Sequence, residues 1–417
     1  MNRISPERAR PPLLVLCQIF YPELVSTGQT LTELCKEMAQ LGWDIEVVCA
    51  APTIIQSAEH VPSDMVFEKV KIHRVWATRF PKLSLIGRVI NQLTYSFTTI
   101  LYLIFNSNDR PILVLTNPPF LPFACLVARL FRPKLRFVLL VFDVYPDTAI
   151  HLGLLARDGW PAKIWERLNI LSFRAAKKVI VIGRCMKDVI LAKGQRVGLD
   201  LTSKLELIHI WADDQMIQEA EAQLPTIFKG RDLENKFIVL YSGNMGRFHD
   251  LETILGAALI LKDHPDIRFA FVGEGAKKKL VLETIAENKL KNCIVETYVP
   301  KEELGRLLRS AQVGLASLSL GQEGLSVPSK TLGIMSAGVP VVAIMSPDSE
   351  ISRLAAEHGF GFVVSPGSIE ELVRVIEKLY DSPELCQKMG NAGRTIVTEQ
   401  LSLAKAAQSY SEIILNL

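Results

Sequence analysis

The stretch VPSKTLGIMSAGVPVVAI, residues 327–344, contains a loop, a helix, a helix stop and a buried strand in immediate succession. Pro328 is typical of the first turn of a helix, and Gly338 is typical of the residue that ends one. The run VPVVAI (339–344) is continuously apolar, as expected for a parallel strand that is covered on both faces. This stretch therefore predicts an α/β domain with a parallel sheet.

The same rhythm of short apolar strands and helices extends outward in both directions. Helices are expected, for example, at 30–41, 302–310 and 350–357. Further strands are expected at 13–17, 44–50, 69–75, 111–116, 135–142, 177–182 and 205–210 in the first half, and at 237–242, 267–272, 293–297 and 313–318 in the second. This alternation predicts two doubly wound, Rossmann-like domains.

A polar stretch near residues 215–235 separates the two halves. We expect a first domain over 12–214 and a second over 236–393, with a helical segment over 394–417 that packs back on the first. Ligands bind such sheets beyond the carboxyl ends of the strands. Two facing halves would therefore form a cleft lined by both sets of loops, which suits a reaction between two separately held substrates.

The composition is that of a globular chain, and it excludes some classes of partner. The formal net charge of the 417 residues is +3, too small to indicate a nucleic-acid partner. The seven cysteines are scattered, form no CxxC motif, and are expected to be buried thiols in a reducing compartment. Residues 1–12 lack an apolar core, so we expect no secretory signal and a cytoplasmic protein.

One uncharged stretch, residues 89–108, is long enough to cross a bilayer, but it contains several polar residues. We favour a helix that is buried in the domain or lies on a membrane surface over a true span. The cations Arg79, Lys82 and Arg88 precede it, as an interfacial helix would require. The expectation is peripheral attachment to the cytoplasmic face of the membrane through residues 79–105.

Glycine-rich loops follow two strands of the second half. In YSGNMGRFHD (241–250), Gly243 and Gly246 would let a phosphate approach the backbone, and Arg247 and His249 would add positive charge. In FVGEGAKK (271–278), Gly273 and Gly275 flank Glu274 and would admit a base or a sugar. A plain turn explains either loop equally well.

Lys330 is the most specific signal in the chain. It stands beside Ser329 at the expected start of a helix, where a lysine is unfavourable unless an anion is bound. A diphosphate would resolve that conflict, and a solvated lysine is the alternative. In the next loop, SPDSEIS (346–352), Asp348 and Ser349 are expected helix caps and Glu350 a first-turn acid.

The first half offers three loops at strand ends. FYPELVSTGQTLTEL (20–34) contains Gly28, which would touch a ligand that spans the cleft. TNPPFLP (116–122) contains Asn117, and VFDVYPD (141–147) contains Asp143 and Tyr145. Asp143 follows so apolar a strand that its carboxylate must be paired, act as a cap, or serve function.

Together these motifs resemble the retaining glycosyltransferases of family 4, which have the GT-B fold. The resemblance covers roughly residues 12–415 and is nearest to the branch of exopolysaccharide, O-antigen and colanic acid synthesis that includes fucosamine-transferase-like proteins. The residues that carry it are FYPE…TG, TNPPF, DVYPD, YSGNMG, FVGEG, VPSKTLGIMSAGVPVVA and GFGFVVSPGS (359–368).

The sequence departs from the family pattern at several functional positions. The two glutamates of the family fall at Leu325 and Gly333, and Glu323 lies two residues before the first. The arginine and lysine that grip the diphosphate fall at Asn244 and His249, and the resemblance transfers the phosphate contact to Lys330.

The resemblance implies transfer of a hexose-type sugar from a nucleoside diphosphate sugar to a lipid-linked or growing glycan acceptor. The expected catalytic residues are Lys330, Asp143 and Glu323, and Asn117, Asp143 and Tyr145 are expected to bind the acceptor. The expected donor contacts are Gly28, Gly243, Asn244, Gly246, Arg247, His249, Gly273, Glu274, Ser329, Lys330 and Glu350. Because the chain contains no Asp-x-Asp pair and no His/Cys cluster, no metal and no further cofactor is expected. A nucleotide-sugar 2-epimerase and a non-catalytic sugar-nucleotide-binding partner of another transferase are the alternatives.

Overall fold

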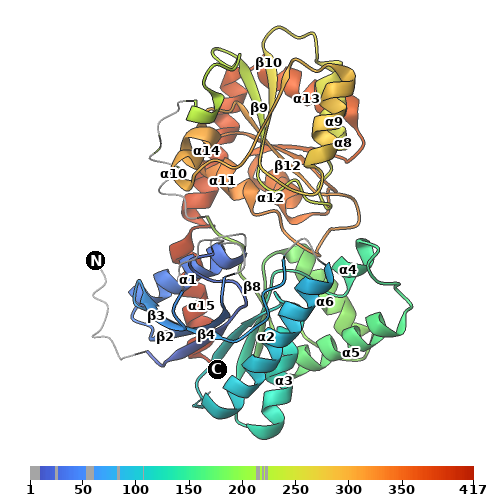
Figure 1. The fold of residues 1–417 in the computed structure, drawn as a ribbon. Helices are drawn as coiled ribbons and strands as arrows, with labels where there is room; N and C mark the ends of the chain where they lie inside the picture. Colours follow the sequence, from blue (N-terminus) through green and yellow to red (C-terminus); the bar gives the residue numbers. More distant parts are fainter. Residues whose placement is uncertain are drawn as a thin grey trace. The chain divides into compact units, whose positions relative to one another are not determined.

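The computed structural model describes residues 10–23, 27–52, 61–81, 85–106, 108–212, 217, 220 and 224–417. The chain divides into two compact units (Figure 1). Unit 1 comprises Met1–His209 and Leu403–Leu417, and unit 2 comprises Ile210–Ser402. The contacts therefore group the C-terminal helix with unit 1 and the polar stretch 215–235 with unit 2.

Unit 1 is built on an eight-stranded sheet with the order β3-β4-β2-β1-β5-β6-β7-β8. The strands are β1 (Leu13–Leu16), β2 (Ile45–Ala50), β3 (Asp64–Phe67), β4 (Val70–Val75), β5 (Ile112–Leu115), β6 (Phe137–Val141), β7 (Lys178–Val181) and β8 (Leu205–Leu207). The helices are α1 (Thr27–Gln40), α2 (Leu85–Asn106), α3 (Leu121–Phe131), α4 (Asp147–His151), α5 (Trp160–Ala175), α6 (Arg184–Gln195) and α15 (Leu403–Leu415). All neighbouring strands pair in parallel except β3, which pairs antiparallel with β4.

Unit 2 is built on a six-stranded parallel sheet with the order β11-β10-β9-β12-β13-β14. The strands are β9 (Phe237–Ser242), β10 (Ile267–Val272), β11 (Cys293–Glu296), β12 (Val313–Ser317), β13 (Val341–Ile344) and β14 (Gly361–Val364). The helices are the 3-10 turn η1 (Thr226–Phe228), α8 (Glu252–Ile260), α9 (Lys278–Asn288), α10 (Lys301–Arg309), α11 (Lys330–Ser336), α12 (Glu350–His358), α13 (Ile369–Tyr380) and α14 (Pro383–Glu399). Two Rossmann-like sheets with their helices confirm the predicted fold class.

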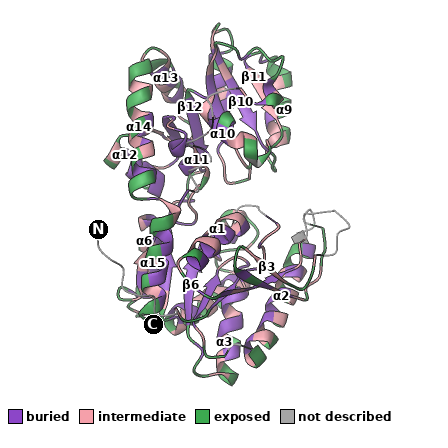
Figure 2. Cartoon of the chain, turned by 90° about the vertical axis from the view of Figure 1, so that its left-hand side faces the viewer, coloured by how far each residue is buried: buried purple, intermediate pink, exposed green. Residues whose placement is uncertain are grey.

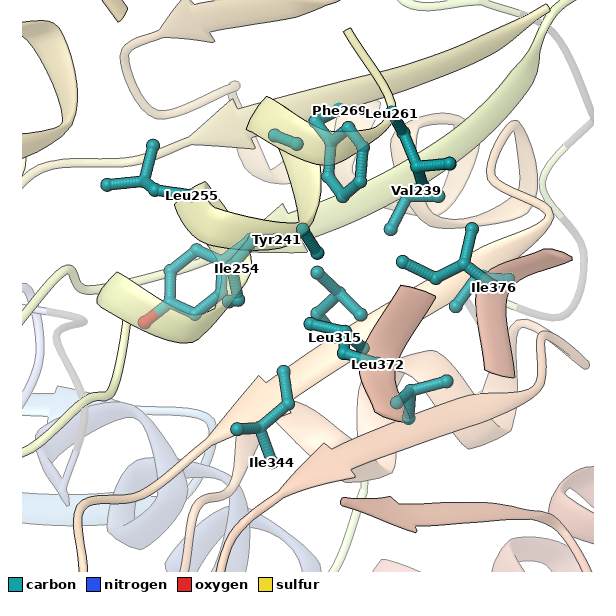
Figure 3. Close-up of a cluster of buried hydrophobic side chains, with 14 of the residues drawn as sticks. Val239, Tyr241, Ile254, Leu255, Leu261, Phe269, Leu315, Ile344, Leu372 and Ile376 are labelled. Carbon is teal, nitrogen blue, oxygen red and sulfur yellow. The ribbon is translucent and has the colours of Figure 1, made fainter. Parts of the chain in front are cut away.

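The apolar strands form the cores, as their unbroken hydrophobic runs predict. Every residue of β1, β5, β6 and β13 is buried, and the exposed residues lie mainly on the outer faces of the helices (Figure 2). In unit 2, β9, β10 and β12 pack against α8 and α13 around Val239, Phe269 and Leu315 (Figure 3). All seven cysteines are free thiols, and five are buried, which agrees with their expected role.

In each sheet the first strand is central: the next strands are added on one side of it, and later strands are added on its other side. In unit 1, β1 lies between β2 and β5, and in unit 2, β9 lies between β10 and β12. At such a switch point the loops that follow the two neighbouring strands diverge and leave room for a ligand. The loops after β1 and β5, and those after β9 and β12, are therefore the positions at which to search for a site.

The C-terminal helix α15 and the helix α2 both belong to unit 1. Helix α15 packs against α1, and the indole of Trp43 donates a 2.9 Å hydrogen bond to the hydroxyl of Ser411. Helix α2 begins at Leu85, ends at Asn106 and contains residues 89–106 of the expected uncharged stretch. Among the described residues, no helix is both long and apolar enough to cross a membrane.

Candidate functional site

The loops after β9 and β12 are tied together at the switch point of unit 2 (Figure 1). The amide of Ser319 donates to the carbonyl of Phe248 at 2.7 Å. His249 Nδ1 lies 2.8 Å from the carbonyl oxygen of Ser317, which can only accept, so the ring carries its proton on Nδ1. The two loops therefore form one rigid rim at the carboxyl edge of the sheet.

Lys330, the first residue of α11, reaches into this rim. Its ammonium donates to the hydroxyl of Tyr241 at 2.5 Å and lies 3.9 Å from the centre of the Tyr241 ring. The Tyr241 hydroxyl in turn donates to the carbonyl of Asn244 at 2.8 Å. The lysine side chain also lies over Gly243, where an added Cβ would be 3.8 Å from its Cε. Lys330, Tyr241 and Gly243 thus bring the first and third predicted loops together.

The electrostatics of Lys330 are those of a cation without a counter-charge. No carboxylate pairs with it in the described part of the chain. Burial lowers the pKa of Lys330 from its ordinary 10.5 to about 7. Burial also lowers the pKa of His249 to about 3, and the neighbouring Lys330 contributes in the same direction. An anion bound beside Lys330 would supply the missing charge.

The glycines of the first two loops serve mainly their mutual packing. A Cβ on Gly273 would lie 2.0 Å from the carbonyl oxygen of Gly243, and one on Gly275 would lie 2.5 Å from that of Met245. Both have positive φ values, 146° and 150°. The backbone of loop 241–250 therefore occupies the space that we expected these glycines to leave for a base or a sugar.

The remaining predicted donor residues surround this centre. Asn244, Arg247, Glu274 and Ser329 are exposed on the loops. The pKa of Glu274 is lowered by its 2.5 Å ion pair with Lys278. Gly246 lies near the His249 ring, since an added Cβ would be 3.3 Å from it.

The predicted acids at this edge are engaged with their own loops. Glu323 accepts a 3.2 Å hydrogen bond from the amide of Gly321. Ser349 caps α12, as predicted, by accepting from the amide of Ser352, and Glu350 is buried in the first turn. The positions of the family glutamates are filled by apolar packing: Leu325 is buried, and a Cβ on Gly333 would meet Leu308 at 3.3 Å.

Two site residues were missed from the sequence. Tyr241 is the last residue but one of β9, and its ring lies in the core (Figure 3), so its residue type gave no sign that its hydroxyl meets Lys330. Gln322 is fully buried, and neither atom of its amide has a hydrogen-bond partner among the described residues. A polar side chain beside an acid in a glycine-rich loop was the available signal for Gln322.

Two of the predicted residues, Asn117 and Gly28, lie at the switch point of unit 1. Asn117, after β5, donates a 3.3 Å hydrogen bond to the hydroxyl of Thr27, the first residue of α1. Gly28 is buried, and an added Cβ would lie 2.7 Å from the Ile19 side chain and 2.9 Å from the Glu23 carbonyl. Packing within unit 1 therefore requires a glycine at this position.

Asp143 and Tyr145 line a small pocket beyond the end of β6. Its other walls include Thr116, Pro119 and Asn169. Burial raises the pKa of Asp143 from its ordinary 3.8 to about 6. Burial, and then the charge of Asp143, raise the pKa of Tyr145, while Arg88 acts in the opposite direction.

Tyr145 itself is held in place on two sides. Its ring stacks on Trp165 with centroids 5.5 Å apart, and its carbonyl accepts a 2.6 Å hydrogen bond from Asn169. The pocket therefore places a carboxylate of raised pKa beside an aromatic wall.

A cluster of metal-binding side chains is absent from the part of the chain that the structure describes. No group of three or more His, Cys, Asp or Glu side chains comes together there in a way that could hold an ion. The positive charge at the unit 2 site comes from Lys330.

Family models match the two halves separately. Residues 27–198 match the model "Glycosyl transferase 4-like domain", and residues 225–396 match "Glycosyl transferases group 1". The chain is 28% identical to "Probable glycosyltransferase WbjE" of Pseudomonas aeruginosa over 72% of each chain. It is 25% identical to "Putative colanic acid biosynthesis glycosyl transferase WcaI" of Escherichia coli over 86% of this chain and 89% of that protein.

Among solved structures, Alr3699/HepE of Anabaena in complex with UDP-glucose has the same fold. The TM-score is 0.70 at 13% identity, over 98% of this chain and all of the other. The two matched halves, the relatives and the two Rossmann-like sheets lead to one assignment. The chain is a glycosyltransferase of the family 4 type with the GT-B fold.

Proposed function

We propose that this enzyme transfers a hexose-type sugar from a nucleoside diphosphate sugar to a lipid-linked or growing glycan acceptor in cell-surface polysaccharide synthesis. The observation that carries the proposal is Lys330, a half-buried lysine at the switch point of unit 2 whose ammonium has no acidic partner among the described residues. A diphosphate is the group in such a donor that this cation would bind. The relatives named for glycosyl transfer and colanic acid biosynthesis support the class of reaction.

In the proposed mechanism unit 2 holds the donor and unit 1 the acceptor. The diphosphate gains negative charge as the sugar–phosphate bond breaks, and Lys330 and the amides near Gly243 would stabilise that charge. Asp143 would accept a hydrogen bond from an acceptor hydroxyl beside Tyr145. Metal independence and retention of anomeric configuration are part of the proposal and follow the family.

The nucleotide is tested by a thermal-shift screen against UDP-, GDP-, dTDP- and ADP-sugars. A ligand that binds the folded state raises the melting temperature by mass action, so one base should stand out. That HepE was solved with UDP-glucose makes UDP-sugars the first to try. If none of the four raises the melting temperature at millimolar concentration, the donor proposal is wrong.

Two further assays separate the proposed reaction from its rivals. A 2-epimerase would convert the donor sugar without any acceptor, so incubation with donor alone should leave it unchanged. A non-catalytic binding partner would bind the donor but transfer nothing. Transfer of a labelled sugar to membrane lipid extracts identifies the transferase.

A further inference from the structure

Helix α2 carries an apolar stripe on its outer face, along its whole length of about 33 Å. Members of the stripe follow one another at helical spacing and are between 37% and 75% exposed. They are Ile86, Val89, Leu93, Phe97, Leu101 and Phe105. A surface helix of a soluble protein normally turns such a stripe inward.

The polar residues of α2 face the protein instead. Asn91 is 5% exposed, and its side chain accepts from the amide of Phe80 at 2.9 Å and donates to the Phe80 carbonyl at 3.0 Å. The hydroxyl of the buried Tyr95 lies 2.8 Å from the carbonyl oxygens of Cys17 and Val48. These bonds fix the rotation of the helix, so the apolar stripe cannot turn inward without leaving buried polar groups unpaired.

Exposed apolar residues also lie on the neighbouring helices α3 and α5. Helix α2 packs against α3, and α3 packs against α5, which places the three helices in one layer of unit 1 (Figure 1). On α3, Leu130 and Phe131 are 78% and 64% exposed, and on α5, Trp160 is 75% exposed. We call the exposed residues of Leu85–Asn106, Leu121–Phe131 and Trp160–Ala175 the α2–α3–α5 face.

The charge on this face is of one sign. The exposed cations of the three helices are Arg88, Lys163, Arg167 and Arg174, and the half-buried Arg129 donates to the carbonyl of Ala175. Their one acid, Glu166, is engaged by the ammonium of Lys193 at 2.8 Å. An apolar surface with interspersed cations complements an anionic lipid headgroup layer, whose interior receives the apolar side chains.

We propose that the α2–α3–α5 face docks on the surface of an anionic lipid bilayer. The apolar stripe would enter the boundary between headgroups and acyl chains, with α2 lying in the plane of the surface. A second copy of this chain is a poorer occupant, because a two-fold contact between identical faces would set cations against cations. The proposal extends the expected membrane attachment from residues 79–105 to a face of three helices.

Arg88, in the first turn of α2, is close enough to Tyr145 for its charge to act on the proposed acceptor pocket, although α2 does not line that pocket. The charge of Arg88 acts on the phenol of Tyr145, which lines that pocket with Asp143. A lipid-linked acceptor could therefore pass from the bilayer surface to Asp143 beside the end of α2. This consequence rests on the proposed function, whereas docking itself does not.

Docking is tested by flotation of the purified full-length protein with vesicles. Vesicles of phosphatidylcholine alone are compared with vesicles that contain phosphatidylglycerol. The wild type should float with the anionic vesicles. L93Q/F97Q should lower the partition coefficient between vesicles and water at least about tenfold, because the two glutamines do not gain the favourable free energy of transfer from water into the apolar layer. K163Q/R167Q should lower it about fivefold or more, and 1 M salt should remove most of that difference.

The matched controls lie on unit 2. Ile260 and Leu282 are 53% and 48% exposed, close to the 61% of Phe97 and the 49% of Leu93. I260Q/L282Q and the charge control K262Q/K291Q should bind vesicles as the wild type does. Equal melting temperatures exclude unfolding of the variants.

Three results would overturn the docking proposal. The wild type fails to float with anionic vesicles, or L93Q/F97Q floats as well as the wild type. Alternatively, sedimentation shows a wild-type dimer that L93Q/F97Q dissociates, which would make the face a contact between two copies. None of these readouts needs glycosyl transfer, so their failure is distinct from that of the proposed function.

Discussion

The ammonium of Lys330 donates to the hydroxyl of Tyr241 at 2.5 Å while lying 3.9 Å from the centre of the same ring. The two residues belong to different strand–helix connections, 89 positions apart in the chain. The tyrosine supplies a polar contact and the negative face of its ring, but no formal charge. The pair therefore holds a cation in place and leaves its charge available to a ligand.

Lys330→Ala should weaken binding of the nucleoside diphosphate about 10- to 150-fold, since a charge-assisted hydrogen bond to phosphate is worth about 1.5–3 kcal/mol. Binding of the free nucleoside should change little. Calorimetry on both ligands measures the difference, and the exposed Lys262→Ala serves as the control. Equal losses for both ligands would place Lys330 away from the diphosphate.

Donor binding should be coupled to proton uptake. With its pKa lowered to about 7, Lys330 is mostly neutral in the free protein at pH 8, and a bound diphosphate would raise that pKa and recharge it. Uptake should approach one proton per nucleoside diphosphate sugar at pH 8, decline toward pH 6, and vanish in Lys330→Ala. Calorimetry in buffers of different ionisation enthalpy measures it, and no uptake at pH 8 by the wild type would contradict the assignment.

The same pKa predicts the pH dependence of stability. Between about pH 7 and 10.5, Lys330 binds a proton in the unfolded chain but not in the folded one. The folded pKa is lowered, so this group makes stability rise with pH across that window. Subtracting the denaturation curves of Lys330→Ala from those of the wild type at pH 7 and pH 10 isolates the effect. If the stability of the wild type relative to Lys330→Ala fell between pH 7 and pH 10, Lys330 could not be neutral in the folded protein.

The sequence predicts the two sheets well because their strands are continuously apolar. It misses β14 at the edge of the second sheet, and it misses β3, whose residues DMVF are at most half-buried and whose pairing with β4 is antiparallel. It also gives no sign that the glycines of 271–278 pack against loop 241–250, because only the structure shows the Gly243 carbonyl against Gly273. Contacts between distant loops are absent from any local pattern.

Helix α2 shows a similar limit. In the sequence, its polar residues only lower the mean hydropathy of the stretch 89–108. The structure shows that Asn91 and Tyr95 bond to the protein and so fix which side of the helix faces outward. That orientation depends on acceptors at Phe80 and Cys17, which no periodicity within the helix reveals.

Turnover should survive an excess of EDTA. The sequence contains no Asp-x-Asp pair, and the proposed charge stabilisation comes from Lys330. The assay is transfer of labelled sugar with and without chelator. Complete loss of activity that Mg²⁺ restores would show that a metal holds the diphosphate.

Asp143→Asn should lower kcat/KM at least about tenfold, because a neutral amide accepts a weaker hydrogen bond than a carboxylate. The wild-type kcat/KM should fall below about pH 6 as Asp143 is protonated. Because the pKa of Asp143 is higher in the folded protein than in the unfolded chain, its ionisation lowers the stability of the folded protein as the pH rises from about 4 to 6. Asp143→Asn should therefore be more stable than the wild type at pH 8, by about 1–3 kcal/mol. Unchanged activity would assign Asp143 a purely structural role.

Gly273→Ala should destabilise unit 2 by more than about 3 kcal/mol, since its Cβ would meet the Gly243 carbonyl oxygen at 2.0 Å. Gly367 is the matched control, because its φ is +88° and an added Cβ would have no neighbour within 4 Å. Gly367→Ala should lower the free energy of unfolding only by the backbone strain at this positive φ, about 1–2 kcal/mol. Because Gly243 lies under Lys330, Gly273→Ala should also weaken diphosphate binding, whereas Gly367→Ala should not. Denaturant unfolding and calorimetry on the two variants measure both effects, and equal losses would show that the two loops can separate without cost.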